Sequence, residues 1–208
     1  MANMAGQTKL VEDGAGKCRL IVLTGPTAVG KGTVEEALRR KHPEVWVSVS
    51  ATTRSPRPGE VDGKTYWFMS EEEFSRKEAA GEFLETALVH NMAHYGTPLQ
   101  PVLDHMAQGV PTILEIDLQG ARRVKEQSKT MSLDVYSVFL APPSYEELVR
   151  RLVGRGTETE EQRHKRLETA KVEMASESEY DRTIVNTTVD QAADELWLVI
   201  AQEYGLKD

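Results

Sequence analysis

The chain has 208 residues, 39% of them hydrophobic, and a formal net charge of −8 at pH 7. This length suits one well-cored domain with small insertions and disfavours two equal domains. The acidic balance excludes a general polyanion-binding surface, so no nucleic-acid partner is expected and any phosphate ligand must be bound locally.

The cysteine content and hydropathy of the chain indicate a cytoplasmic location. Its single cysteine, Cys18, has no partner for a disulfide or a CxxC motif, which fits a reducing compartment. No run approaches the ~20 apolar residues of a membrane span, and the first residues lack the apolar core of a secretory signal. We therefore expect a cytoplasmic protein without membrane association, in which the polar residues 1–17 form a disordered tail.

The first predicted strand, Leu20–Leu23, runs into a glycine loop that a helical pattern follows. The loop reads Gly25-Pro26-Thr27-Ala28-Val29-Gly30-Lys31-Gly32-Thr33. Strand, glycine loop and helix form a phosphate cradle, in which backbone N–H groups, the helix N-terminus and Lys31 meet an anion. The segment predicts a nucleoside triphosphate site. Because Gly32 stands where this motif usually has a magnesium-binding hydroxyl, we expect Mg²⁺ to be held mainly by ATP phosphates and water.

Further short apolar runs alternate with helical stretches along the chain. Strands are predicted at residues 45–49, 112–116, 135–140 and 183–185, and this alternation implies a parallel sheet. S-x-x-E capping boxes at Ser70 and Ser144 mark two helix starts, and an apolar stripe from Ala193 to Tyr204 marks a final helix packed on the core. Residues 51–95, with prolines, glycines and clustered aromatics, interrupt the alternation and predict a small inserted subdomain.

A pair of arginines after a strand end predicts a second phosphate site. Arg54 and Arg57, with Tyr66 nearby in sequence, can clamp a single phosphate, because planar guanidinium forks bind it bidentately. A second phosphate site implies a second phosphorylated substrate. The alternative is a pair of surface arginines on a proline-stiffened turn.

Three more arginines, Arg151, Arg155 and Arg166, lie in or at the end of the densely charged stretch 150–166. We interpret this stretch as a mobile flap that brings positive charge to a transferring phosphoryl group and excludes water. The alternative is a solvated helix face on which these arginines pair with Glu158, Glu160 and Glu161.

Glu85 and Asp117 are candidates for recognising a base. Guanine presents two adjacent donors on its pairing edge, whereas adenine has a lone pair at N1, so a carboxylate accepts from guanine and repels adenine. Taken alone, Glu85 would more often be a solvated residue of an amphipathic helix. The spacing by itself does not decide between these interpretations.

Six segments together resemble the guanylate kinase family. They are Gly25-Pro-x-x-x-Gly-Lys, the string from Ser48 to Tyr66, Tyr95-Gly-Thr97, Ile116-Asp-Leu-Gln-Gly120, Ala141-Pro-Pro-Ser144 and Gly154-Arg-Gly-Thr-Glu-Thr-Glu160. They follow the family's order and cover nearly everything after the tail. The resemblance implies an α/β P-loop nucleoside monophosphate kinase fold, with a five-stranded parallel core sheet flanked by helices, an inserted GMP-binding region and a lid. It also implies the reaction ATP + GMP ⇌ ADP + GDP with Mg²⁺, in purine nucleotide metabolism.

Matching the family pattern residue by residue implies the substrate contacts. Guanine would meet Ser50, Glu85, Thr97 and Asp117, and the GMP phosphate would meet Arg54, Arg57, Tyr66 and Tyr95, with Glu60 in the same loop. ATP would be bound by residues 25–33, including Lys31, with Asn186 beside the adenine. Catalysis would fall to Lys31, Arg54, Arg151, Arg155 and Arg166.

The same match divides the chain into regions. The tail is 1–17, the core comprises 18–51, 96–149 and 167–208, the GMP-binding region is 52–95 and the lid is 150–166. ATP and GMP would be the partners of a monomer or small homo-oligomer.

Three positions depart from the family pattern. Gly32 replaces the usual serine and gives a GKGT ending similar to that of adenylate kinases. The stretch from Glu85 to Tyr95 is one residue longer than usual, with His94 where a second tyrosine is common. Glu115 replaces a frequent aspartate.

Two other functions stay open. A guanylate-kinase-like binding module would keep the fold without the reaction, but such modules typically lose the loop lysine or the lid arginines that this chain retains. An AMP-directed kinase is hinted at by the GKGT ending and is disfavoured by Glu85, Asp117 and the string from Ser48 to Tyr66.

Overall fold

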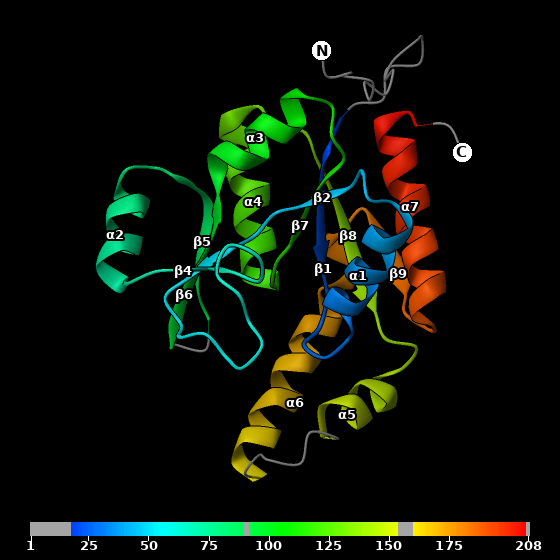
Figure 1. The fold of residues 1–208 in the computed structure, drawn as a ribbon. Helices are drawn as coiled ribbons and strands as arrows, with labels where there is room; N and C mark the ends of the chain where they lie inside the picture. Colours follow the sequence, from blue (N-terminus) through cyan, green and yellow to red (C-terminus); the bar gives the residue numbers. More distant parts are fainter. Residues whose placement is uncertain (1–17, 90–91, 154–159, 207–208) are drawn as a thin grey trace.

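A five-stranded parallel sheet forms the centre of the molecule (Figure 1). The computed structural model of the chain describes residues 18–89, 92–153 and 160–206. The strands of the central sheet are β1 (Leu20–Thr24), β2 (Trp46–Val47), β7 (Thr112–Glu115), β8 (Val135–Ala141) and β9 (Arg182–Val185), in the order β2-β7-β1-β8-β9. In register, Ile21 of the central strand lies beside Ile113 on one side and Tyr136 on the other. The predicted parallel core sheet is confirmed.

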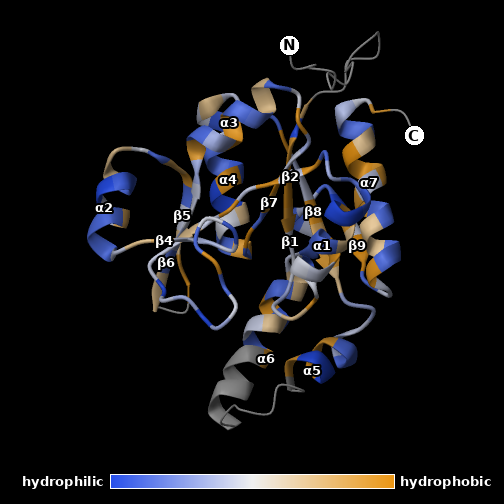
Figure 2. Ribbon diagram, viewed as in Figure 1, coloured by the Kyte–Doolittle hydropathy of each residue, from blue (hydrophilic) through white to orange (hydrophobic). Residues whose placement is uncertain are grey.

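Two hydrophobic cores cover the two faces of this sheet. On one face, Ile21 and Leu23 pack with α1 (Lys31–Lys41), α5 (Tyr145–Val153), the end of α6 (Glu160–Ala175) and α7 (Val189–Tyr204). On the other face, Leu20 and Val22 pack with α3 (Leu99–Ala107) and α4 (Leu118–Met131). Because both faces are covered, β1 is apolar along most of its length. Figure 2 shows this hydrophobic centre between helices with hydrophilic outer faces.

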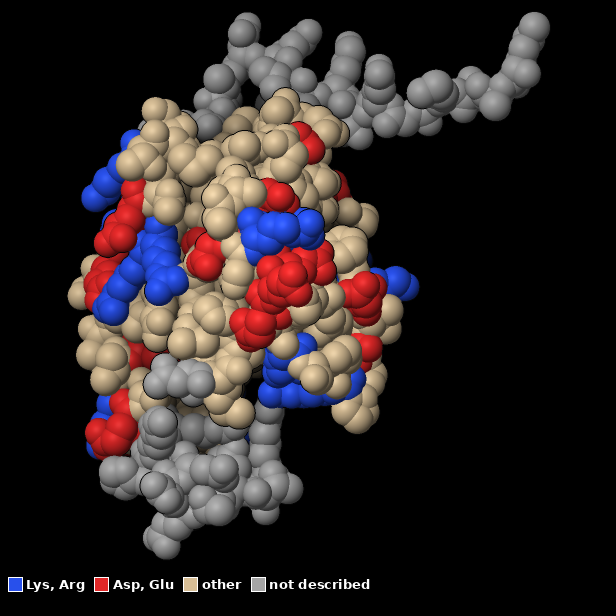
Figure 3. Space-filling view, turned by 90° about the vertical axis from the view of Figure 1, so that its left-hand side faces the viewer, with Lys and Arg blue, Asp and Glu red and all other residues tan. Residues whose placement is uncertain are grey.

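The stretch that interrupts the alternation forms a second sheet. Its strands are β3 (Ala51–Thr52), β4 (Trp67–Phe68), β5 (Phe83–Val89) and β6 (Ala93–Pro98), in the order β4-β3-β6-β5. Helix α2 (Glu71–Ala79) buries Phe74, whose ring stacks on Phe83 at 4.6 Å. Leu84 of β5 joins the core that contains α4, so this sheet is anchored to the first. The molecular face on this side carries interspersed acidic and basic side chains (Figure 3).

The local signals in the sequence are mostly reproduced. Ser70 Oγ accepts from Glu73 N at 3.1 Å and Ser144 Oγ accepts from Glu147 N at 3.2 Å, which confirms both helix starts. The strand predicted at 45–49 is shorter, because β2 is an edge strand that leaves the sheet after Val47 as the chain turns toward β3. A 3₁₀ turn, η1 (Glu177–Glu179), precedes β9. Among the described residues, no helix combines the length and the hydropathy that crossing a bilayer requires.

Candidate functional site

The glycine loop connects the end of β1 to the N-terminus of α1. Gly25 has a φ of +152°, and Gly30 has a φ of +101° directly before α1. Helix α1 begins at Lys31, so its positive end opens onto the loop. Lys31 Nζ donates to the carbonyl oxygen of Gly25 at 2.8 Å, which places the charge of the lysine across the loop. These groups are those that a polyphosphate requires.

Gly25 is required by the close approach of β8. A Cβ at this position would lie 2.3 Å from the carbonyl oxygen of Leu140, a backbone atom that cannot turn away. We expect Gly25→Ala to lower the free energy of unfolding by about 2–4 kcal/mol, measured by urea denaturation. Gly109→Ala is the matched control, because Gly109 has a φ of +71° with no atom within 4 Å and tests the backbone strain alone. Equal losses in the two variants would contradict the steric argument.

Asn186, predicted to lie beside the adenine, and Arg151, predicted to be catalytic, both brace this loop. The carbonyl oxygen of Val29 accepts from Asn186 Nδ2 at 2.8 Å and from Arg151 Nη1 at 3.1 Å. Arg151 also donates to Glu147 at 2.9 Å, a neighbour on its own helix that the sequence analysis did not consider. Asn186 is buried against the loop, and a Cβ on Gly30 would lie 2.9 Å from its Nδ2.

The other two lid arginines are not located by the structure. Arg155 lies outside the described residues, as do residues 154–159 of the predicted flap. Arg166 lies on α6 in the segment whose side chains are not described. A residue that the sequence analysis missed comes from the same helix: Glu173 accepts from the backbone N of Thr27 at 3.0 Å, so a carboxylate meets an N–H of the glycine loop.

A second cationic cluster forms around Arg54, where the chain leaves β3. Thr52 of β3 pairs with Tyr95 of β6, which brings the tyrosine beside the strand end. Arg54 Nε donates to the Tyr95 hydroxyl at 3.0 Å, and its two Nη atoms donate to the two Glu60 oxygens at 3.0 and 2.9 Å. The Tyr66 ring lies 5.4 Å from the Arg54 guanidinium carbon and meets Tyr95 edge-on.

The charges in this cluster stabilise one another. The Glu60 carboxylate raises the pKa of Arg54, and Arg54 together with the Arg57 backbone N–H lowers the pKa of Glu60. Burial raises the pKa of the Tyr66 hydroxyl. The side chain of Arg57 is exposed, and its backbone N donates to Glu60 at 2.7 Å. Arg54, Arg57, Tyr66 and Tyr95 therefore lie in one region, with Glu60 among them.

The interpretation of Glu85 as a solvated residue of an amphipathic helix is wrong. Glu85 lies on β5, is only 6% exposed, and accepts from Thr97 Oγ1 of β6 at 2.8 Å. Its position follows from the β5–β6 register, which pairs Glu85 with Thr97, and from α4, which packs on β5. Burial, with a smaller contribution from the Asp117 charge, raises the pKa of Glu85 to about 7.

Asp117 lies near Glu85, at the point where the chain leaves the central sheet and begins α4. It directly precedes α4, and its Oδ1 accepts from Gly120 N at 2.8 Å as a helix cap. A Cβ on Gly120 would lie 3.0 Å from Glu85 Oε2 and 3.3 Å from Asp117 Oδ1. The two carboxylates thus converge on the one residue of this helix turn that has no side chain. Gly120 was not among the predicted site residues, although a glycine in the first turn of a helix is unfavourable by propensity and is a usable signal.

A cavity of about 100 Å³ lies between α1 and the segments that contain Ser50 and Tyr66. Ser50 and Tyr66 line it from one side, and Glu35 and Glu115 line it from the other. Burial and the neighbouring Glu115 charge raise the pKa of Glu35 to about 7. Glu115 Oε2 lies 3.6 Å from where a Cβ on Gly32 would be. Glu35, one helical turn after Lys31, is another residue that the sequence analysis missed.

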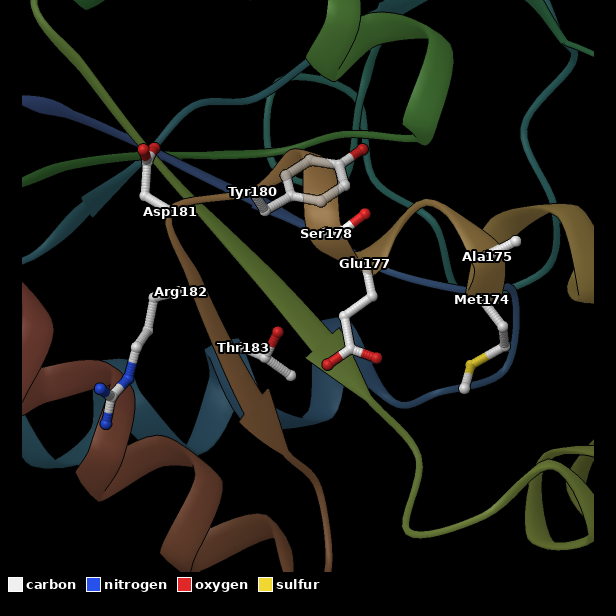
Figure 4. A pocket seen from close by; sticks show the side chains of 8 residues that line it. All are labelled: Met174, Ala175, Glu177, Ser178, Tyr180, Asp181, Arg182 and Thr183. Atoms are coloured by element: carbon white, nitrogen blue, oxygen red, sulfur yellow. The ribbon is translucent and has the colours of Figure 1, made fainter.

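A larger open hollow of about 550 Å³ lies away from these residues, at η1 and the start of β9 (Figure 4). It is lined by side chains from the end of α6, from η1 and from β9, among them Glu177, Tyr180 and Arg182. None of the residues predicted from the sequence to bind a substrate lines it. The convergence of predicted residues, rather than cavity size, therefore defines the candidate site.

Comparison with known proteins identifies the family to which this chain belongs. The model of the family described as guanylate kinase matches residues 17–203. The chain is 74% identical to a guanylate kinase of Bifidobacterium longum over 188 residues, covering 90% of this chain and 96% of the relative. It is 55% identical to a guanylate kinase of Thermobifida fusca, covering 92% and 96%. Its fold is similar to the crystal structure of guanylate kinase from Anaplasma phagocytophilum, with a TM-score of 0.72, 33% identity and coverage of 91% and 88%. The chain belongs to the guanylate kinase family.

Proposed function

We propose that this chain transfers the terminal phosphoryl group of ATP to GMP and releases ADP and GDP in the cytoplasm. The observation that carries the proposal is the convergence of the buried Glu85 carboxylate and the partly buried Asp117 carboxylate at Gly120, which offers adjacent acceptors to a base with two adjacent donors. Two separate anion sites, the glycine loop and the Arg54 cluster, support a donor and an acceptor that both carry phosphate.

The residues divide between the two substrates. Residues 25–33, including Lys31, hold the ATP phosphates, and Asn186 lies beside the adenine. Guanine is bound by Ser50, Glu85, Thr97 and Asp117, and the GMP phosphate by Arg54, Arg57, Tyr66 and Tyr95. We place the GMP-binding region at 52–95, the lid at 150–166 and the core in the remaining segments after the tail, in a monomer or small homo-oligomer.

The reaction requires little covalent chemistry from the protein. The attacking oxygen belongs to a GMP phosphate that is already anionic, so positioning and charge neutralisation account for most of the rate. Lys31, Arg54 and the lid arginines Arg151, Arg155 and Arg166 supply that charge. Arg151 contacts the loop at the carbonyl oxygen of Val29, which places its guanidinium beside the segment proposed to hold the phosphates.

The donor set near the loop fits a hydrated Mg²⁺ rather than a metal cage. Among the described residues, no three His, Cys, Asp or Glu side chains are grouped to hold a metal. Mg²⁺ usually keeps several waters and binds through substrate phosphates with one or two carboxylates. Glu115, next to Gly32, is suitably placed to contact its water shell. When bound with ATP, the ion neutralises charge on the phosphates.

The test is a coupled assay of ADP release with magnesium-ATP, in which GMP and AMP are offered in parallel. We expect turnover with GMP that exceeds turnover with AMP by about 10³-fold or more, because the wrong base leaves buried acceptors unpaired. Preference for AMP would mean that Glu85 and Asp117 do not read the base. A folded protein that binds GMP but turns over neither substrate would instead be a binding module.

A further inference from the structure

The hydrogen bonds of Arg54 leave almost no donor free for a ligand. A guanidinium group has five N–H donors. Nε donates to Tyr95, one Nη donates to both Ser55 O at 2.7 Å and Glu60, and the other Nη donates to Glu60. Four of the five donors are therefore used, two of them by the bidentate pair with Glu60. This is the geometry with which Arg binds a phosphate.

The charge of the cluster is also too low for its proposed ligand. The phosphate of a nucleoside monophosphate is mostly a dianion at pH 7, because its second pKa is about 6. Arg54 and Arg57 together would neutralise it, but Glu60 cancels one of the two charges. The carboxylate and an incoming phosphate would also repel each other at hydrogen-bond distance from the same guanidinium.

Glu60 sits on a segment that can release it. Residues 55–59, between Arg54 and Glu60, are exposed and belong to no helix or strand. Gly59, directly before Glu60, has a φ of +87° and no atom within 4 Å of its Cβ direction. The carboxylate itself is fastened by Arg54 and by the Arg57 backbone N at 2.7 Å. These contacts can be exchanged for a phosphate without disturbing a hydrophobic core.

We propose that Glu60 is a specificity-determining residue that occupies the phosphate clamp of the free enzyme and is displaced by a dianionic phosphoryl group. The inference rests on the proposed function, in which the Arg54 cluster receives the GMP phosphate. Once Glu60 leaves, Arg54 keeps its bond to Tyr95 on β6, so its Nε stays in place and its two Nη atoms are free for the phosphate. A guanine ligand without that dianion cannot replace the carboxylate, and the clamp stays closed to it.

The experiment compares GMP with guanosine in the full-length protein by isothermal titration calorimetry. The ratio of the guanosine dissociation constant to the GMP dissociation constant isolates the phosphate site, because both ligands carry the same base, and this ratio should rise when GMP binds more tightly. In Glu60→Gln, whose amide is nearly isosteric but uncharged, we expect GMP to bind about 5-fold more tightly and guanosine to be unchanged, because the phosphate no longer has to displace a charged carboxylate from Arg54. Glu72→Gln, an exposed glutamate of α2, is the control for the change in net charge.

Each outcome decides one point. A ratio that falls or stays constant in Glu60→Gln overturns the inference, because Glu60 would then orient Arg54 or remain in place. Equal binding of GMP and guanosine by the unmodified protein would instead refute the phosphate clamp and the proposed function with it. Glu60→Ala provides the same test if the glutamine variant is not folded by circular dichroism, and it is expected to shift the ratio in the same direction.

Discussion

Replacing Lys31 with alanine is expected to lower kcat by about 10²–10³-fold, the loss seen when one preorganised charge or donor is removed from a transition state. Lys31 Nζ lies 2.8 Å from the carbonyl oxygen of Gly25, inside the loop, and the terminal phosphates would replace that carbonyl as its partner. Charge spread over the transferring phosphoryl group makes this cation more important in the transition state than in the bound substrate.

The fold should survive the change. The change removes one part-buried hydrogen bond to Gly25 and a long one of 3.5 Å to Pro26, so we expect the free energy of unfolding to fall by about 1 kcal/mol or less. The matched control is Lys41→Ala at the far end of the same helix, which removes an ion pair to Asp194 but lies outside the loop. Steady-state turnover with magnesium-ATP and GMP measures the effect. Near-normal turnover in Lys31→Ala, with a folded protein, would refute the assignment of the loop.

Replacing Glu85 with glutamine is expected to weaken the recognition of GMP and to increase the free energy of unfolding of the ligand-free protein. A glutamine turns an N–H₂ group toward one of the two donors of guanine, so we expect kcat/KM for GMP to fall by about 10²–10³-fold. The KM for ATP should change little, because Glu85 lies on β5 of the second sheet and not at the glycine loop. An unaltered kcat/KM for GMP would show that Glu85 does not contact the base.

The stability effect follows from the raised pKa. Burial raises the pKa of Glu85 from the ordinary 4.5 to about 7, so the folded protein binds this proton more tightly than the unfolded chain does. Its contribution to stability is therefore complete below about pH 4.5 and is lost as pH rises through about 7. Glu85→Gln removes this loss. We expect the variant to be more stable than the unmodified protein by about 1–3 kcal/mol at pH 8, with a smaller difference near pH 5.

Urea denaturation of the ligand-free protein at the two pH values measures this difference. Glu35 also titrates near pH 7, but it is present in both proteins and cancels in the comparison. Glu82→Gln is the control, since Glu82 lies just before β5, is half-exposed and pairs with Lys77. A Glu85→Gln variant that is less stable at pH 8 would mean that the charged carboxylate is not destabilising in its buried site.

The glycine loop was predictable because its chemistry is contiguous. Nine consecutive residues, 25–33, carry the turn, the N–H groups, the helix start and the lysine, and the apolar run before them marks the strand. The parallel sheet was predictable for a related reason. Strands buried on both faces are apolar throughout, and the helical stretches between them leave a crossover as the connection. The two capping boxes are equally local, and both are confirmed.

The residues of the base site could be predicted from motifs, but their arrangement in space could not. Glu85 lies in a strand rather than on a solvated helix face because β5 pairs with the following strand β6 and is covered by α4, which is distant in sequence. Burial of the carboxylate, its raised pKa and its meeting with Asp117 over Gly120 all follow from that packing. The assignments of Arg155 and Arg166 stay predictions from the sequence alone.

In this chain, residues within a few positions of each other therefore specify the phosphate loop, the helix caps and the alternation of strands and helices. Strand register and helix packing add what a linear pattern cannot contain. They bring Tyr95 to Arg54 and place two carboxylates around one glycine. The physical reason is that desolvation and charge pairing depend on distances in space, which become defined only when the two sheets pack together.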